Sequence, residues 1–170
     1  MKHARMLLPL LLSILPAFTG SGAARADDVS RTDPKNLVKY TMPAGWTNDR
    51  MKNGRHYTRV GLPEDPNMLA VIPELRDAYM TMEKMRAGRQ SVHAAQEHRQ
   101  ISEKMSSFNG FDVWEAVFEA TIRGQPVVMH TYLLISDTLM VDVHLNASKD
   151  VYARYLPDLR KVVRSVQALQ

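Results

Sequence analysis

Three turn signals between residues 96 and 147 constrain the fold of this chain more than any other feature. Asn109-Gly110 is the strongest short signal for a hairpin turn, and Gly124-Gln125 and Ser136-Asp137-Thr138 mark two more. Apolar and polar residues alternate in the stretches between the turns, which is the pattern of strands with one buried face. The sequence therefore predicts a four-stranded antiparallel meander.

Each turn also predicts how the strands on either side of it pair. The expected pairs are, in chain order, Met105 with Trp114, Phe118 with Thr131, and Leu133 with Val141. Under these registers one face of the meander collects the apolar side chains of Met105, Trp114, Ala116, Phe118, Ala120, Met129, Leu133, Ile135, Val141, Val143 and Leu145. A slip of one residue at a turn would move the apolar set of a strand to the opposite face, so the face assignment depends on the turns.

The rest of the chain adds shorter strands and two helices. Strands are expected at residues 37–42, 55–60 and 67–72, with a loop rich in Pro and Gly at 61–66. Apolar residues spaced by three or four predict a helix over 75–95 and another after Ser148, which is expected to cap it. Pro157 predicts a kink or a break in that last helix. The fold class is α+β, an antiparallel sheet of about seven strands with two helical segments packed on it.

The first 26 residues have the pattern of a cleavable signal peptide. Lys2 and Arg5 precede an apolar stretch over 6–18, and Ala24-Arg25-Ala26 offers small residues at the two positions that a signal peptidase reads. No other apolar stretch approaches the ~20 residues of a membrane helix. We expect cleavage after Ala26 and a periplasmic location, with residues 27–36 as a flexible leader and 37–170 as a single domain.

Composition excludes several classes of protein. Three of the 22 Lys and Arg residues lie in the signal peptide, so the remainder is nearly neutral and lacks the basic surface of a nucleic-acid-binding protein. The absence of Cys excludes disulfides, thiolate metal sites and Cys nucleophiles. No common hydrolase, phosphate-binding or dinucleotide-binding motif follows residue 26. An enzyme is therefore the less favoured interpretation.

A candidate metal site comes from the polar face of the meander. The predicted registers place Glu119 opposite His130 and His130 opposite His144, and they make Tyr132 and Asp142 the next pair along. Two imidazoles and a carboxylate at that spacing suit zinc, or iron or copper, with Asp142 as a fourth ligand or as an acceptor that orients His144. The alternative is an ordinary polar sheet face, where Lys104 opposite Glu115 would form a plain ion pair.

Two further features are candidate contacts for a protein partner. Trp46 follows Pro43-Ala44-Gly45 on a loop, where an aromatic residue can anchor an interface or fold back over the core. Arg86, Arg89 and His93 could present a basic face of the first helix to a partner, or simply lie on its solvated side.

The order of the expected elements and three short motifs give this chain a family resemblance. The motifs are Tyr40–Trp46 at the start of the domain, Phe108-Asn109-Gly110 before the meander, and Arg164-Ser165-Val166 near the end. Together they resemble the PsbP/DcrB-like superfamily, whose members act through protein–protein interactions and have no catalytic residue in common. The resemblance implies a non-enzymatic exported interaction module, either an assembly factor for an envelope complex or a toxin-immunity type of protein. The alternative is a metal-binding or metal-dependent protein.

Overall fold

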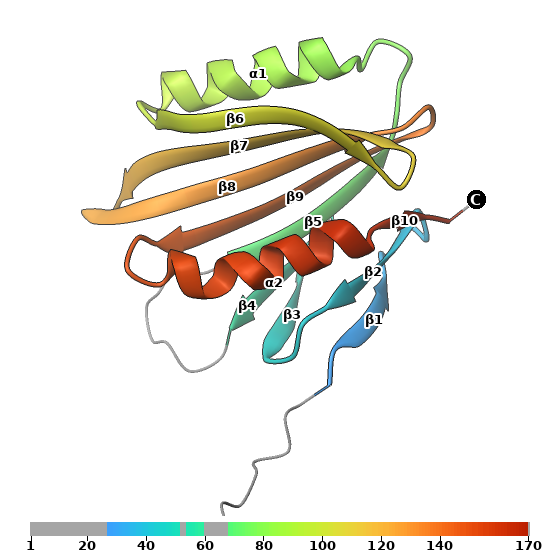
Figure 1. Ribbon diagram of the computed structural model, residues 1–170, viewed down its shortest axis with the longest axis horizontal. Coiled ribbons are helices and arrows are strands. Elements are labelled where there is room, and N and C mark those ends of the chain that lie inside the picture. Colours follow the sequence, from blue (N-terminus) through green and yellow to red (C-terminus); the bar gives the residue numbers. More distant parts are fainter. Residues whose placement is uncertain (1–26, 52–53, 60–67, 170) are drawn as a thin grey trace, which may run out of the picture.

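Two antiparallel sheets form the framework of the molecule, and the computed structural model describes it over residues 27–51, 54–59 and 68–169 (Figure 1). The larger sheet has seven strands in the order β3-β4-β5-β9-β8-β7-β6, and the smaller has three in the order β1-β2-β10. The larger one comprises β3 (Trp46–Met51), β4 (Gly54–Arg59), β5 (Met68–Leu75), β9 (Leu139–Ser148), β8 (Gln125–Ile135), β7 (Phe111–Ile122) and β6 (Arg99–Phe108). The smaller comprises β1 (Val29–Thr32), β2 (Val38–Met42) and β10 (Gln167–Ala168).

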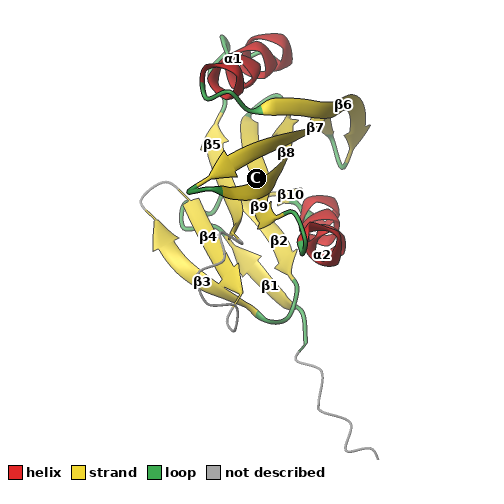
Figure 2. Ribbon diagram, turned by 90° about the vertical axis from the view of Figure 1, so that its left-hand side faces the viewer, coloured by secondary structure: helices red, strands yellow, loops and turns green. Residues whose placement is uncertain are grey.

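Helices α1 (Met82–Ala95) and α2 (Tyr152–Ser165) lie on opposite faces of the larger sheet (Figures 1 and 2). Each helix closes its own apolar cluster. The cluster under α1 contains Trp114, Ala116, Phe118, Leu133, Ile135 and Met140, with methionines from α1 and the segment before it. The larger cluster under α2 contains Val113, Leu134, Val141, Val143, Leu145 and Ala147 of the sheet, and Tyr155, Leu159, Val162 and Val163 of the helix. The central strands β7, β8 and β9 are therefore buried on both faces.

Helix α1 begins later than the sequence predicted. Leu75 is the last residue of β5, where it pairs with Leu139, so the apolar spacing that suggested a helix from residue 75 belongs partly to a strand. The helix starts after Thr81, whose side chain accepts a hydrogen bond from the backbone N–H of Lys84 at 3.3 Å. Met82 and Met85 then pack on the cluster beneath the helix.

Helix α2 is continuous through Pro157, so the predicted break is wrong. Its apolar side is buried on the sheet on both sides of the proline, which offsets the lost backbone hydrogen bond. The predicted cap is wrong as well. Ser148 is the last residue of β9, and the N-cap position is Val151, which makes no side-chain capping bond.

The meander β6–β9 confirms the four predicted strands, and its first turn has the expected form. Asn109 and Gly110 have φ angles of 51° and 79°, the left-handed pair that a two-residue hairpin turn requires. Arg123 and Gly124 have φ angles of 53° and 79° and form the second turn, in place of Gly124-Gln125. The register of β7 with β8 therefore differs from the predicted one by two residues, since Phe118 pairs with Met129 and not with Thr131. A shift of two residues leaves every side chain of β8 on its predicted face.

The third turn changes the outcome for β9. It is one residue longer than predicted, because Ile135 pairs with Met140 and not with Leu139. A shift of one residue reverses both faces of a strand. Val141, Val143 and Leu145 therefore point to α2, whereas the sequence placed them with Trp114 and Phe118 on one face.

The segments before residue 75 contain more strands than predicted. Strand β1 lies inside the stretch 27–36 that the sequence assigned to a flexible leader, and it pairs along β2 from Val29 with Met42 to Thr32 with Lys39. Strand β3 starts at Trp46, where only a turn was expected. Strands β2, β4 and β5 match the three predicted strands. The predicted signal peptide at 1–26 and the loop at 61–66 lie outside the described residues.

Two glycines with open surroundings give a matched test of the backbone. An added Cβ would meet nothing within 4 Å at Gly110 or at Gly88, but Gly110 has a φ of 79°. Gly110→Ala should lower the free energy of unfolding by about 1 kcal/mol, because only glycine adopts this conformation without strain. Gly88→Ala, in the exposed middle of α1, should raise it by roughly 0.5–1 kcal/mol. Urea denaturation measures both, and equal effects would contradict the turn geometry.

Candidate functional site

A polar network lies on the α2 face of the sheet, at the point where β7, β8 and α2 meet. The side chain of His130 is at its centre and is only 2% exposed. Its Nδ1 lies 2.7 Å from the hydroxyl of Tyr152, and its Nε2 lies 3.0 Å from Oε1 of Glu115. Tyr132 donates its hydroxyl to the same carboxylate oxygen at 2.8 Å, and Nζ of Lys104 lies 3.2 Å from Oε2. The predicted pair of Lys104 and Glu115 is thus confirmed.

The protonation states of this network follow from its surroundings. Burial lowers the pKa of His130 and outweighs the opposite effect of Glu115. Burial acts to raise the pKa of Glu115, but the hydrogen bonds from Tyr132 and Lys104 and the charge of Lys104 together lower it. A neutral His130 therefore donates from Nε2 to an ionised Glu115 and accepts the hydroxyl hydrogen of Tyr152 at Nδ1. Every polar group of the centre has a partner.

The network opens to solvent through a groove beside α2. The hollow has a volume of about 580 Å³ and lies between the C-terminal half of α2 and the strands β6 and β7. Most of its lining residues are polar or charged and two are apolar, and they are Lys104, Ser106, Phe108, Asn109, Glu115, Tyr132, Arg160, Val163 and Arg164. The amide of Asn109 closes the end of this groove, because it donates to the backbone carbonyls of Arg164 and Val166.

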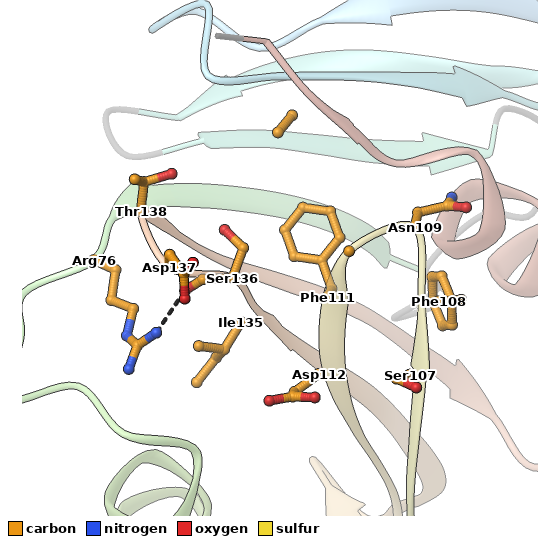
Figure 3. A pocket seen from close by; sticks show the side chains of 12 residues that line it. Arg76, Ser107, Phe108, Asn109, Phe111, Asp112, Ile135, Ser136, Asp137 and Thr138 are labelled. Carbon is orange, nitrogen blue, oxygen red and sulfur yellow. Dashed lines mark hydrogen bonds between the residues drawn. The ribbon is translucent and has the colours of Figure 1, made fainter.

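Figure 3 shows a second hollow, at the end of the sheet that carries the β6–β7 and β8–β9 turns. Its volume is about 710 Å³. Phe108 and Phe111 lie on one side of it, and the turn at Ser136 lies on the other. The guanidinium of Arg76 donates to the carbonyls of Ser136 and Met80, at 2.7 and 3.0 Å. The cation that lines this hollow therefore holds the β8–β9 turn against the segment before α1.

On the α1 face, charged and imidazole groups bind the helix to the sheet. Arg89 forms an ion pair with the buried carboxylate of Asp142. Burial raises the pKa of Asp142 and outweighs the opposing charge of Arg89. The imidazole of His93 stacks on Phe118 with ring centroids 3.7 Å apart, and its Nδ1 lies 2.9 Å from Nδ1 of His98.

The predicted metal ligands are not brought together, so that prediction of a site is wrong. His130 pairs with Leu145 and Thr131 pairs with His144, which places the two imidazoles on opposite faces of the sheet. The side chain of Glu119 instead pairs with Arg99 and Lys149 at the surface. The one-residue shift at the third turn moves His144 to the other face, and the two-residue shift at the second turn places Glu119 opposite Val128 in place of His130. Within the described part of the chain, no three His, Cys, Asp or Glu side chains gather as a metal ion would need.

The predicted partner contacts are also engaged within the protein. Trp46 is 5% exposed, donates its indole N–H to Asp158 at 2.8 Å and packs edge-on against Tyr155. Trp46 therefore folds back and fixes α2, and its alternative role as an exposed anchor is wrong. Arg89 and His93 face the sheet as described above, and Arg86 lies 4.0 Å from Glu103 of β6. The basic face of α1 is turned toward the sheet.

Sequence reasoning missed the contribution of α2 to the groove. Tyr152 and Arg160 approach Glu115 from a helix far along the chain, and no local spacing predicts that approach. The one available signal was the pairing of Lys104 with Glu115, which marks the strands on which the site lies.

Comparisons with known proteins identify the fold. No family model matches the sequence, and no curated protein matches it. The structure of cyanobacterial PsbP from Synechocystis matches with a TM-score of 0.64 at 13% identity, over 91% of this chain and 99% of that one. LpqN of Mycobacterium tuberculosis, a protein involved in cell envelope biogenesis, matches with a TM-score of 0.59 at 12% identity, over 84% and 91%. A protein of Bacteroides thetaiotaomicron matches with a TM-score of 0.64 at 9% identity, over 85% and 50%.

These structures share one α+β architecture with the present chain. The chain has the PsbP/DcrB-like fold, as its motifs and element order predicted. At these identities the likeness defines the fold, and the function has to be argued from the surface of the molecule. No helix in the described residues is long and apolar enough to cross a membrane.

Proposed function

We propose that this protein is a non-enzymatic exported interaction module that binds an extended segment of another protein along β6. The observation that carries the proposal is the exposure of this strand. β6 is ten residues long, lies at the edge of the seven-stranded sheet and is exposed at every position except Phe108. Natural proteins usually cover or shorten such an edge, because its free N–H and C=O groups pair with any strand they meet.

The open edge presents a regular row of backbone groups. The two-residue turn makes Phe108 and Phe111 a hydrogen-bonded pair. In an antiparallel ladder such pairs alternate with pairs whose backbone N–H and C=O groups point away from the partner strand. The N–H groups of Glu103, Met105 and Ser107 therefore point away from β7. A register shift near Ile101 interrupts only the first part of the strand. Strand addition to an exposed edge is a common mode of peptide recognition.

The side chains on β6 support the same proposal. Ile101 and Met105 are 45% and 50% exposed, which is unusual for apolar residues in the middle of a strand. A partner strand with apolar residues at alternate positions would cover them. The edge contains no proline, and its only lysine, Lys104, is paired with Glu115. Proline and a free lysine commonly protect an edge strand, and this strand lacks the first and has the second in an ion pair.

The setting of this activity is part of the proposal. We propose that the chain is exported, is cleaved after Ala26 and acts in the periplasm on an envelope complex or a secreted protein. Support comes from the signal-like composition of residues 1–26 and from the fold shared with LpqN, which is involved in cell envelope biogenesis. An assembly factor and a toxin-immunity type of protein would both use such an edge.

A proline on the strand edge tests the proposal. Met105→Pro removes one outward N–H and should leave the pairing with β7 intact, because edge strands accept proline where the N–H faces solvent. Met105→Ala is the matched control, since it removes the same side chain and keeps the N–H. We expect affinity purification from the native host to recover one protein with the wild type and with Met105→Ala, and not with Met105→Pro. Equal recovery with all three, or recovery of this chain alone, would contradict the proposal.

A further inference from the structure

The groove beside α2 carries a surplus of positive charge. Lys104, Arg160 and Arg164 line it, and Glu115 is the only acidic residue among its lining side chains. A hollow lined by one sign of charge concentrates the field at its mouth and attracts ligands of the opposite sign. The charge of the groove therefore favours an anion.

The negative charge of Glu115 is already used inside the network. Its two oxygens accept bonds from Tyr132, His130 and Lys104. Arg160 reaches only the hydroxyl of Tyr132, and within the described residues neither Arg160 nor Arg164 forms an ion pair with a carboxylate. The two arginines are four residues apart on α2 and so lie on the same side of the helix. Two guanidinium groups are thus available to one ligand.

The size and the other walls of the groove limit what the ligand can be. A volume of about 580 Å³ is much larger than a single inorganic ion and lies in the range of sites for small molecules. Phe108 and Val163 contribute apolar surface to the lining, while Ser106 and Asn109 offer neutral polar groups. The lining therefore suits a molecule with an anionic head and an apolar part.

We propose that this groove binds a small amphipathic anion, with a carboxylate or phosphate head on Arg160 and Arg164 and an apolar part against Phe108 and Val163. Guanidinium groups bind such oxyanions through paired, charge-assisted hydrogen bonds. The ion pair with Lys104 balances the negative charge of Glu115, so the carboxylate does not repel the anionic head of the ligand. The site takes Lys104, Ser106 and Phe108 from β6, but it uses their side chains on the α2 face and none of the outward N–H groups of Glu103, Met105 and Ser107. It therefore does not depend on the proposed strand addition.

Titration of the ¹⁵N-labelled protein with phenyl phosphate tests the site. We expect the amide signals of Ser106, Phe108 and Asn109 to shift with one common dissociation constant, which should weaken as salt rises. Arg160→Gln with Arg164→Gln should weaken binding about tenfold or more, since each charge-assisted bond to an anion contributes on the order of 1.5–3 kcal/mol. Arg154→Gln is the matched control, because Arg154 is on the same helix and outside the groove.

Three further binding measurements distinguish the contribution of the anionic head from that of the apolar part, and a free anion from a lipid. Inorganic phosphate should shift the same amides with lower affinity, because it has the head and lacks the apolar part. Benzyl alcohol, which has no charge, should shift none of them. Vesicles of phosphatidylglycerol that sediment with the wild type and not with the double variant would identify a lipid headgroup as the source of the anion. Shifts outside the groove, equal binding of benzyl alcohol, or an equal loss with Arg154→Gln would overturn the proposal.

Discussion

Replacing Trp114 with alanine is expected to lower the free energy of unfolding by about 3–5 kcal/mol. Trp114 is 0% exposed and is the largest fully buried side chain of the described residues. It packs edge-on against Phe118, with ring centroids 6.5 Å apart, and donates its indole N–H to Glu103 at 2.9 Å. Its removal leaves a cavity under α1, because the sheet and the helix relax only partly into the empty space.

The matched control lies directly across the strand pair. Met105 pairs with Trp114 but is 50% exposed, so Met105→Ala should change stability by less than about 1 kcal/mol. Urea denaturation of the two variants at one pH measures both effects. A loss below about 1 kcal/mol for Trp114→Ala would mean that the α1 face of the sheet is not a second core.

The second large effect is expected at Glu115. Glu115→Ala removes the acceptor of the buried donors on His130 and Tyr132, and each donor left without a partner costs roughly 1–3 kcal/mol. The expected loss is about 3 kcal/mol or more. Glu115→Gln keeps a carbonyl oxygen for these donors and should lose markedly less.

Glu119→Ala is the control for a carboxylate on the same strand that pairs only at the surface. Glu119 is bound by Arg99 and Lys149, both of them exposed, so its removal should leave the midpoint of urea denaturation close to that of the wild type. If Glu115→Ala proved as mild as Glu119→Ala, the polar network would contribute little to the fold.

A pH series on the wild type measures the same network independently. Burial lowers the pKa of His130 below the ordinary value of 6.5, so the unfolded chain takes up this proton first as pH falls. The contribution of the neutral imidazole is complete above about pH 6.5 and is lost below it. His93 adds to this loss because its pKa is lowered by burial, while the raised pKa of Asp142 acts in the opposite direction. His130→Gln should reduce the loss of stability between pH 7 and pH 5.

The turns show how far the sequence could predict this fold. Asn109-Gly110 set the first hairpin correctly, because both residues readily take positive φ. The second turn uses Arg123 at a φ of 53°, a position where arginine gives no signal. Alternation could not correct the third turn, because helices cover both faces of the sheet and apolar residues occur on both.

The candidate site follows the same logic. The register of β6 with β7 was right, and so the pair of Lys104 and Glu115 was found in advance. The register of β9 was wrong by one residue, and the predicted cluster of His130 with His144 failed with it. Tyr152, Arg160 and Arg164 come from α2, and only the packing of this helix on the sheet brings them to the groove.

Amide hydrogen exchange along β6, in the free protein and in complex with its recovered partner, tests the proposed function most directly. In the free protein the amides of Glu103, Met105 and Ser107 should exchange fast, while Lys104 and Ser106, which are paired with β7, should be protected. In the complex the three outward amides should become protected as well, because a partner strand accepts their hydrogen bonds. Fast exchange of these three amides in the complex would contradict the account.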